Sequence, residues 1–220
     1  MTTNHTDIVA ILDKSGSMGC VRGDTIGGFN TFVTEQQAGE GTCALTLIQF
    51  DHEYEVCYEA RSIQSVEPLT EATYVPRGTT GLLDAIGRAV NSTIERQNRQ
   101  RVKTDNTIVV IQTDGFENCS KEFTKPQINK LISDCTRDRD WQFVFLGAGQ
   151  DAIAEAQSLG IGRNSTLSYG GTAKGTRQAF NAMSRASTQY RTTRGANPSA
   201  AGAFEFTASE REAQRSEGAI

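Results

Sequence analysis

Two continuous apolar segments, each ended by an aspartate, limit most strongly what this chain can fold into. The first is Asp7-Ile-Val-Ala-Ile-Leu-Asp13 and the second is Asn106-Thr-Ile-Val-Val-Ile-Gln-Thr-Asp114. Strands that lack alternation between apolar and polar residues are buried on both faces, as central strands of a parallel sheet are. Both segments are therefore predicted to be central strands that carry an acid at their carboxyl ends.

The rest of the chain alternates between helical and strand patterns. Two strand patterns, Cys43–Phe50 and Glu53–Arg61, are joined by Asp51-His52, and so short a connection favours an antiparallel hairpin. A helix is predicted to begin near Thr80, a residue type that caps helices well. Further helices are predicted over residues 26–37, 126–139, 150–159 and 172–191, and further strands over 141–146 and 165–169.

This alternation predicts an α/β fold that is doubly wound and Rossmann-like. The central sheet is expected to be mostly parallel, with one antiparallel edge strand and helices on both faces. Residues 1–191 are expected to form this domain. Residues 192–220 are expected to be a flexible C-terminal tail, because Phe204, Phe206 and Ile220 are its only large apolar residues. A capping box at Thr207–Glu210 would allow a short helix there.

Charge and composition exclude several classes of partner and site. The net charge of −4 gives no electrostatic reason to bind nucleic acid or an anionic membrane. No basic leader and no run of 18 apolar residues is present, and the five cysteines include no C-x-x-C pair, so a reducing cytoplasm is the expected location. His5 and His52 are the only histidines, too few for a multi-histidine metal site.

Polar residues gather where the predicted central strands end. The first strand is followed by Asp13-Lys-Ser15-Gly-Ser17, a second segment is Gly78-Thr-Thr80, and the other strand ends in Thr113-Asp114-Gly115. In doubly wound sheets the site lies beyond the carboxyl ends of the strands. Oxygen ligands without histidine or cysteine suit Mg²⁺, Mn²⁺ or Ca²⁺. The candidate metal ligands are Asp13, Ser15, Ser17, Thr80 and Asp114.

These three elements, in this order, resemble the von Willebrand factor type A (VWA) domain and its metal-ion-dependent adhesion site. The resemblance runs from about Asp7 to Arg191 and is greatest to short bacterial and bacteriophage members. It implies a divalent ion, usually Mg²⁺, bound directly by Ser15, Ser17 and Thr80, with Asp13 and Asp114 acting largely through coordinated water. It also implies a protein partner that presents an Asp or Glu side chain to the ion, and no catalysis.

Two alternatives compete with an interaction module. A Mg²⁺-dependent phosphohydrolase of the haloacid dehalogenase type would use Asp13 as nucleophile, but Ser15 stands where that motif needs its second acid, the general acid and base. A structural assembly subunit would not need the metal site. The sequence does not identify the partner, the ion used in the cell or the oligomeric state.

Overall fold

The computed structural model describes residues 5–100, 104–149, 151–197 and 204–219. Its core is a six-stranded sheet with the order β3-β2-β1-β4-β5-β6, in which β1 and β4 are the central pair. All neighbours are parallel except β2 and β3, which pair antiparallel at one edge. The strands are β1 (His5–Asp13), β2 (Thr42–Phe50), β3 (Tyr54–Ser62), β4 (Asn106–Thr113), β5 (Gln142–Ala148) and β6 (Thr166–Tyr169).

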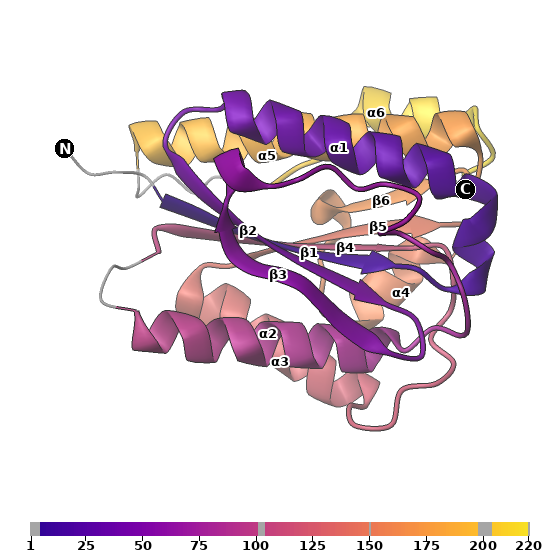
Figure 1. Cartoon of the computed structure of the whole chain (residues 1–220), viewed down its shortest axis with the longest axis horizontal. Coiled ribbons are helices and arrows are strands. Elements are labelled where there is room, and N and C mark those ends of the chain that lie inside the picture. The colour runs from indigo at the N-terminus through magenta and orange to yellow at the C-terminus, as the bar shows by residue number, and fades with distance from the viewer. Residues whose placement is uncertain (1–4, 101–103, 150, 198–203, 220) are drawn as a thin grey trace.

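Helices cover both faces of the sheet (Figure 1). On one face lie α1 (Arg22–Ala38), α5 (Ala173–Ala196) and α6 (Ala208–Arg215), and on the other lie α2 (Leu82–Arg99), α3 (Lys125–Arg139) and α4 (Ala152–Ser158). Three short 3₁₀ turns complete the described elements: η1 (Gly16–Val21), η2 (Ile63–Ser65) and η3 (Arg163–Ser165). No helix in the described parts of the chain is both long and apolar enough to cross a lipid bilayer.

The sheet has an apolar layer on each of its faces, which explains why apolar and polar residues do not alternate along β1 and β4. In β1, Ile8, Ala10 and Leu12 pack into the layer under α1 and α5, whereas Val9 and Ile11 pack into the layer under α2 and α3. Side chains of a strand point alternately to its two faces, so a strand between two apolar layers must be apolar throughout. The predicted fold class, including the antiparallel edge strand and helices on both faces, is confirmed.

The helix predicted to begin near Thr80 is present, but Thr80 does not cap it. The helix α2 begins at Leu82, and no side chain of its own N-terminal residues caps it. Its first free N–H groups are instead satisfied from the loop after β4: Leu83 N donates to Glu117 Oε2 at 2.9 Å, and Asp84 N donates to Ser120 Oγ at 3.1 Å. The Thr80 hydroxyl is thereby left available for another purpose.

The C-terminal segment differs from the flexible tail predicted for residues 192–220. The helix α5 continues beyond the predicted boundary at 191, to Ala196. Further on, Phe204 and Phe206 are 1% and 5% exposed and pack edge to face, with ring centroids 5.7 Å apart. The burial of these two large aromatic side chains in the core helps to offset the cost of ordering the segment.

A short helix follows these two aromatic residues. The predicted capping box is formed, with Thr207 and Glu210 hydrogen-bonded in both directions at the start of α6. Glu210 also forms an ion pair with Arg185 of α5, at 2.6 Å. Residues 204–219 therefore pack on the domain, while Ile220, the third apolar residue of the predicted tail, lies outside the described residues.

Candidate metal centre

The candidate site lies at the point where the winding of the sheet reverses. Because β1 and β4 are adjacent and parallel, their carboxyl ends reach the same edge of the sheet, which places Asp13 and Asp114 near one another. The chain leaves β1 toward α1 on one face and leaves β4 toward α3 on the other. Such a switch point opens a crevice between the two connections, as in other doubly wound folds.

Three hydroxyl groups converge beside Gly115. A Cβ atom placed on this glycine would lie 2.9 Å from Thr80 Oγ1, 3.6 Å from Ser17 Oγ and 3.7 Å from Ser15 Oγ. The two serine oxygens are 3.1 Å apart. Three neutral oxygen donors from two separate loops thus surround one point, which stays open because residue 115 has no side chain.

The two aspartates adjoin these hydroxyls. Asp114 Oδ1 accepts a 2.6 Å hydrogen bond from Ser17 Oγ. Asp13 is fully buried, and its two oxygens accept hydrogen bonds of 2.6 Å each from the Ser15 backbone N–H and the Thr113 hydroxyl. The structure therefore brings together all five residues that the sequence singled out.

The electrostatics of the two aspartates favour a cation. Burial raises the pKa of Asp13 to about 6, against the hydrogen bonds from Thr113 and Ser15, and the charge of Asp114 raises it slightly further. Burial also raises the pKa of Asp114. Within the described residues every hydrogen-bond donor to these two carboxylates is neutral. Asp13 is buried and Asp114 is partly buried, and two neighbouring acids without a positive partner would be stabilised by a divalent ion.

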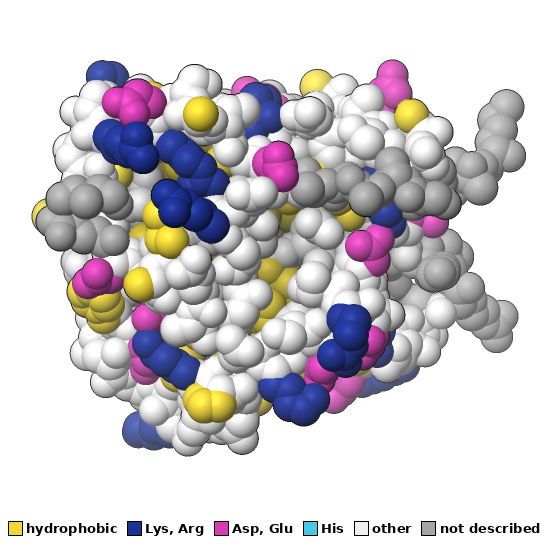
Figure 2. Space-filling view, turned by 180° about the vertical axis from the view of Figure 1, so that it is seen from behind, with side chains coloured by type: hydrophobic (Ala, Val, Ile, Leu, Met, Phe, Trp, Pro, Cys, Tyr) yellow, Lys and Arg dark blue, Asp and Glu magenta, His cyan; other side chains and the backbone are white. Residues whose placement is uncertain are grey.

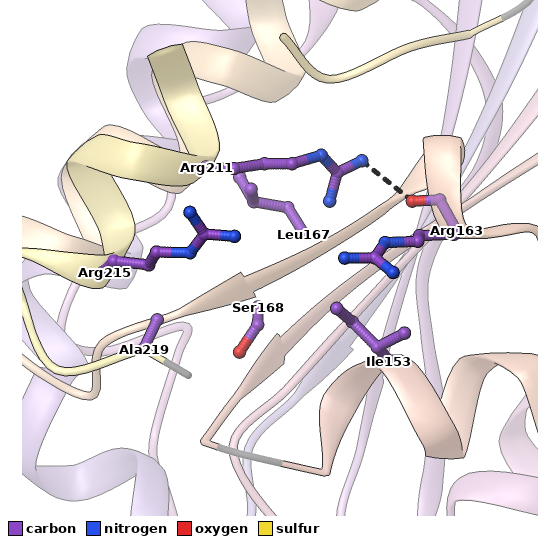
Figure 3. A pocket seen from close by; sticks show the side chains of 7 residues that line it. All are labelled: Ile153, Arg163, Leu167, Ser168, Arg211, Arg215 and Ala219. Atoms are coloured by element: carbon purple, nitrogen blue, oxygen red, sulfur yellow. Dashed lines mark hydrogen bonds between the residues drawn. The ribbon is translucent and has the colours of Figure 1, made fainter. Parts of the chain in front are cut away.

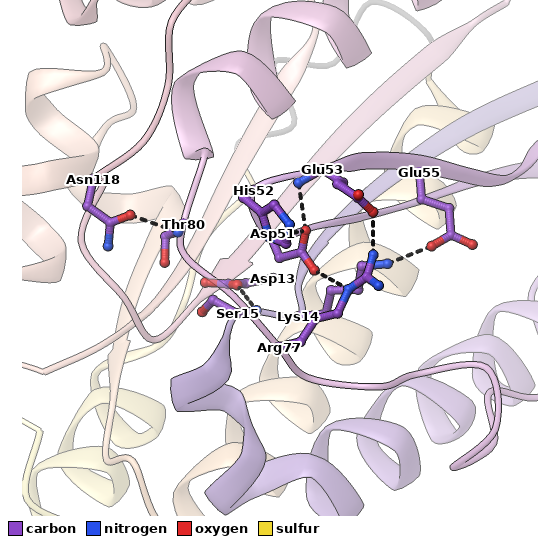
Figure 4. Close-up of polar contacts among 10 residues, drawn as sticks. All are labelled: Asp13, Lys14, Ser15, Asp51, His52, Glu53, Glu55, Arg77, Thr80 and Asn118. Atoms are coloured by element: carbon purple, nitrogen blue, oxygen red, sulfur yellow. Dashed lines mark hydrogen bonds and ion pairs between the residues drawn. The ribbon is translucent and has the colours of Figure 1, made fainter.

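Nearby cationic side chains do not fill that role, because other acids engage them (Figure 4). Lys14 Nζ lies 2.6 Å from Glu55. Arg77 forms ion pairs with Glu53 and, at 2.9 Å, with the buried Asp51. The backbone of the same loop is tied to the residues after β1, since Arg77 N donates to Lys14 O at 2.7 Å.

A close approach at Gly78 fixes the segment that carries Thr80. Gly78 has φ +65°, and a Cβ there would lie 2.2 Å from His52 Nδ1, so only glycine fits. The His52 side chain is half exposed, and its Nδ1 is 3.3 Å from Asp51 Oδ1. His52 therefore shapes the loop and is not one of the converging oxygen donors.

Asn118 is a site residue that the sequence analysis missed. Its side-chain oxygen accepts a 2.9 Å hydrogen bond from Thr80 N, and its own backbone N–H donates to Thr80 O at 3.0 Å. Figure 4 shows Asn118 reaching Thr80 from the loop after β4. Both backbone polar groups of Thr80 are thus held by one residue. A single loop asparagine has no periodicity or spacing that would have marked it in the sequence.

The same loop is tied to α2 by a second set of hydrogen bonds. The Asp84 carboxylate accepts from three consecutive backbone N–H groups, those of Lys121, Glu122 and Phe123, at 2.8 to 3.0 Å. Glu117 in turn accepts from Leu83 N, Cys119 N and Ser120 N. The loop that carries Gly115 and Asn118 is therefore fixed to the helix that follows Thr80.

The donor set and its geometry fit a hard divalent cation. Ser15, Ser17 and Thr80 present hydroxyl oxygens toward one space, and Asp13 and Asp114 supply the negative charge beside it. With oxygen donors alone, Mg²⁺, Mn²⁺ or Ca²⁺ suit the site better than metals that prefer nitrogen or sulfur.

Comparison with known families and structures agrees with this architecture. The model of the protein family described as "von Willebrand factor type A domain" matches residues 7–194 of this chain. No curated protein matches the chain significantly. Proximal thread matrix protein 1 from the mussel byssus, solved with a zinc-occupied metal-ion-dependent adhesion site, is 15% identical with a TM-score of 0.59. The match covers 84% of this chain and 46% of that protein, so the chain spans less than half of its length.

Two bacterial pilus proteins share the fold. The pilus adhesin SpaC from Lactobacillus rhamnosus GG, in an open conformation, is 14% identical with a TM-score of 0.61, over 86% of this chain and 30% of that one. The corresponding domain of the type V pili tip protein Mfa5 from Porphyromonas gingivalis is 12% identical with a TM-score of 0.55, over 84% of this chain and 95% of that one. At these identities the likeness shows the fold alone.

Proposed function

Because the chain belongs to the von Willebrand factor type A domain family, we propose that it is a metal-dependent protein-interaction module. Domains of this family are typically adhesion or interaction modules rather than catalysts. In the proposed site Ser15, Ser17 and Thr80 bind Mg²⁺, or Mn²⁺ or Ca²⁺ in its place, and Asp13 and Asp114 support it. The convergence of the three hydroxyls beside Gly115 is the observation that carries this proposal.

The chemistry of the donors explains why an acidic partner would bind. An ion held by neutral hydroxyls keeps most of its positive charge, so it attracts an anionic oxygen donor. The zinc-occupied adhesion site of the mussel byssal protein supports metal binding on this fold. We propose that the partner presents an Asp or Glu side chain to the ion.

The surface around the site adds a second requirement for the partner. Among the described residues, three large apolar side chains are exposed, and two of them lie on the site loops: Phe116, 66% exposed, and Val75, 49% exposed. Phe116 follows Gly115 directly. Val75 follows Tyr74, whose hydroxyl donates to the backbone carbonyl of Asp13. Exposed aromatic anchors at the centre of an interface contribute strongly to affinity, so the acidic residue is expected to be flanked by apolar ones.

The burial of Asp13 argues against the phosphohydrolase alternative. A nucleophilic aspartate must reach its substrate, whereas Asp13 is fully buried and both of its oxygens accept hydrogen bonds. Ser15 occupies the place of the second acid that such an enzyme needs. An assembly subunit without a metal would have no use for the converging hydroxyls, so it ranks second. We retain the cytoplasm as the proposed location, on the ground of cysteine content.

Capture of a partner from the native host tests the proposed function. Immobilised wild-type protein in Mg²⁺ is compared with the same protein in chelator, with Thr80→Ala, and with Thr34→Ala as a control on the exposed face of α1. A partner retained by wild type and Thr34→Ala, but lost with chelator and with Thr80→Ala, is expected. Binding that ignores both chelator and Thr80→Ala would contradict the proposal.

A double-mutant cycle then locates the contact. Thr80→Ala is combined with substitution of each candidate acid on the captured partner. When the partner acid that contacts the ion is substituted, the loss of binding free energy should not add to the loss caused by Thr80→Ala, since both changes remove the same contact. In parallel, steady turnover of phosphomonoesters by the Mg²⁺-loaded protein that disappears in Asp13→Asn would favour the hydrolase instead.

A further inference from the structure

A cavity of about 70 Å³ lies at the outer edge of the sheet, between β6, α4 and α6. Three arginine side chains line it: Arg163 from η3 and Arg211 and Arg215 from α6. Figure 3 shows the head groups of Arg163 and Arg215 pointing toward each other, with Arg211 extended above them. The remaining lining residues are Ile153, Leu167, Ser168 and Ala219. The cavity is larger than the roughly 30 Å³ that one water molecule occupies in the liquid.

The positive charge around this cavity is not balanced by the protein. In the described part of the chain Arg163 has no acidic partner, and Arg215 has only Glu212, in an exposed pair at 2.8 Å. Glu210, beside Arg211 in the sequence, is engaged by Arg185. The net charge of the whole chain is −4, so this concentration of positive charge is local. Basic side chains also gather at the upper left of the face in Figure 2, the side on which α6 lies.

Arg211 is the fixed member of the group. Its Nη1 donates to Thr166 O at 2.7 Å, and its Nη2 donates to Arg163 O and Asn164 O at 2.8 and 3.1 Å. Three of the five N–H groups of its guanidinium are thus used on backbone carbonyls of η3 and β6, and two remain. Burial lowers the pKa of Arg211, and the charges of Arg163 and Arg215 lower it further.

A purely structural role explains Arg211 but not the other two. By bonding the carbonyls of an edge strand, Arg211 covers β6 and joins it to α6. The side chains of Arg163 and Arg215 take no part in these backbone contacts, yet they place two more like charges beside Arg211. Like charges around one cavity cost free energy unless an anion lies between them.

We propose that this cavity binds a phosphoryl group. A carboxylate carries one charge and is satisfied by one guanidinium in a bidentate pair. A phosphoryl group carries about −1.5 to −2 charges and three strong acceptor oxygens at neutral pH, which matches three guanidiniums from separate segments. This inference is independent of the metal centre, which lies at the ends of β1 and β4, two strands away in the sheet order.

Calorimetry on the full chain tests the proposal, at constant ionic strength and with chelator present so that no metal–phosphate species forms. The probes are inorganic phosphate, O-phosphoserine and acetate. One site with Kd below about 1 mM is expected for inorganic phosphate or O-phosphoserine. Tighter binding of phosphate would indicate a free oxyanion as the natural ligand, and tighter binding of O-phosphoserine would indicate a phosphorylated side chain.

Variants decide whether this cavity is the site. Arg163→Gln combined with Arg215→Gln changes two exposed side chains and leaves Arg211 in place, so the fold should persist. Affinity is expected to fall at least tenfold. Arg99→Gln combined with Arg137→Gln removes the same charge from two arginines that are 76% and 66% exposed elsewhere, and should leave affinity within about twofold. No saturable binding of either phosphoryl probe, equal loss in both double variants, or binding of acetate as tight as phosphate would overturn the proposal.

Discussion

Ser17 donates a 2.6 Å hydrogen bond to Asp114, a residue 97 positions further along the chain. The bond spans the switch point of the sheet and joins the loop after β1 to the end of β4. With the 3.1 Å contact between Ser15 Oγ and Ser17 Oγ, it holds the candidate donors in one place through contacts of the protein itself. Such a site loses little conformational entropy when it takes up a ligand.

One divalent ion per chain is therefore expected to bind. Calorimetric titration of chelator-stripped protein with Mg²⁺ or Mn²⁺ should give a stoichiometry near one. Thr80→Ala and Ser17→Ala should each weaken binding at least tenfold, since even outer-shell partners of a metal are worth about 10- to 100-fold. Thr34→Ala, which removes an exposed hydroxyl from α1, should bind like wild type. Unchanged affinity in both site variants would show that the ion lies elsewhere.

Gly115→Ala is expected to abolish ion binding without unfolding the protein. The added methyl group would lie 2.9 Å from Thr80 Oγ1 and would occupy the space that the three hydroxyls surround. Gly19→Ala is the matched control, because a Cβ there meets nothing within 4 Å. Circular dichroism would check that both variants fold, and calorimetry would compare their affinities. If Gly115→Ala bound Mg²⁺ like Gly19→Ala, the hydroxyls would not surround the ion.

Asp84 is expected to make stability depend on pH in acid. Burial opposes ionisation of this carboxyl, but hydrogen bonds from Lys121, Glu122 and Phe123 outweigh it and lower the pKa below the ordinary 3.8. A lowered pKa gives stability that is present above the unfolded-state pKa and is lost as the pH falls through the folded-state value. Urea unfolding should show wild type more stable than Asp84→Asn at pH 7.

The decisive measurement is how the stability difference between wild type and Asp84→Asn changes with pH. The gap in unfolding free energy between wild type and Asp84→Asn should narrow as the pH falls below 3.8. Glu95→Gln serves as control, because this acid forms only an exposed pair with Arg99 on α2. If the difference in unfolding free energy between wild type and Asp84→Asn stayed constant from pH 7 to pH 3, the stabilisation by the backbone N–H groups of the loop would not depend on the negative charge of Asp84.

Phe204→Ala is expected to destabilise the protein by about 3 to 5 kcal/mol, the usual cost of truncating a buried phenylalanine. Phe204 is 1% exposed and packs with the apolar residues under α1 and α5. Phe116→Ala makes the same change at a side chain that is 66% exposed, so its unfolding free energy should stay within about 0.5 kcal/mol of wild type. Equal urea midpoints for both variants would mean that the C-terminal segment adds no stability.

Local sequence patterns were enough to predict the strands, the helix order and the five residues that gather at one edge of the sheet, whose role as metal ligands stays a prediction. Uninterrupted apolar runs mark central strands, and the acid that ends each run marks the edge of the sheet where they meet. The strand order itself is a tertiary property. It follows from β1 pairing with both β2 and β4, which no local pattern specifies.

The differences from the sequence predictions have one physical origin, which is contact between distant segments. Thr80 has a good capping side chain, but Glu117 and Ser120 supply the cap of α2 instead. The segment after residue 191 has few apolar residues, yet Phe204 and Phe206 are both buried against the domain. Arg163 and Arg211 are 48 positions apart, so no pattern in the sequence joins them.

The position of β1 between β2 and β4 also sets the order in which the strand pairs of the sheet can form during synthesis. Its pairing with β2 needs residues up to about 50, whereas its pairing with β4 begins at Thr6 with Asn106 and closes a loop of about 100 residues. Long-range parallel pairing of this kind is slow, because the loop must close before its contacts form. During synthesis, Asp13 therefore meets its neighbours on β4 only after about half of the chain has been made, and the proposed ion site cannot be complete on a nascent chain that stops before Asp114.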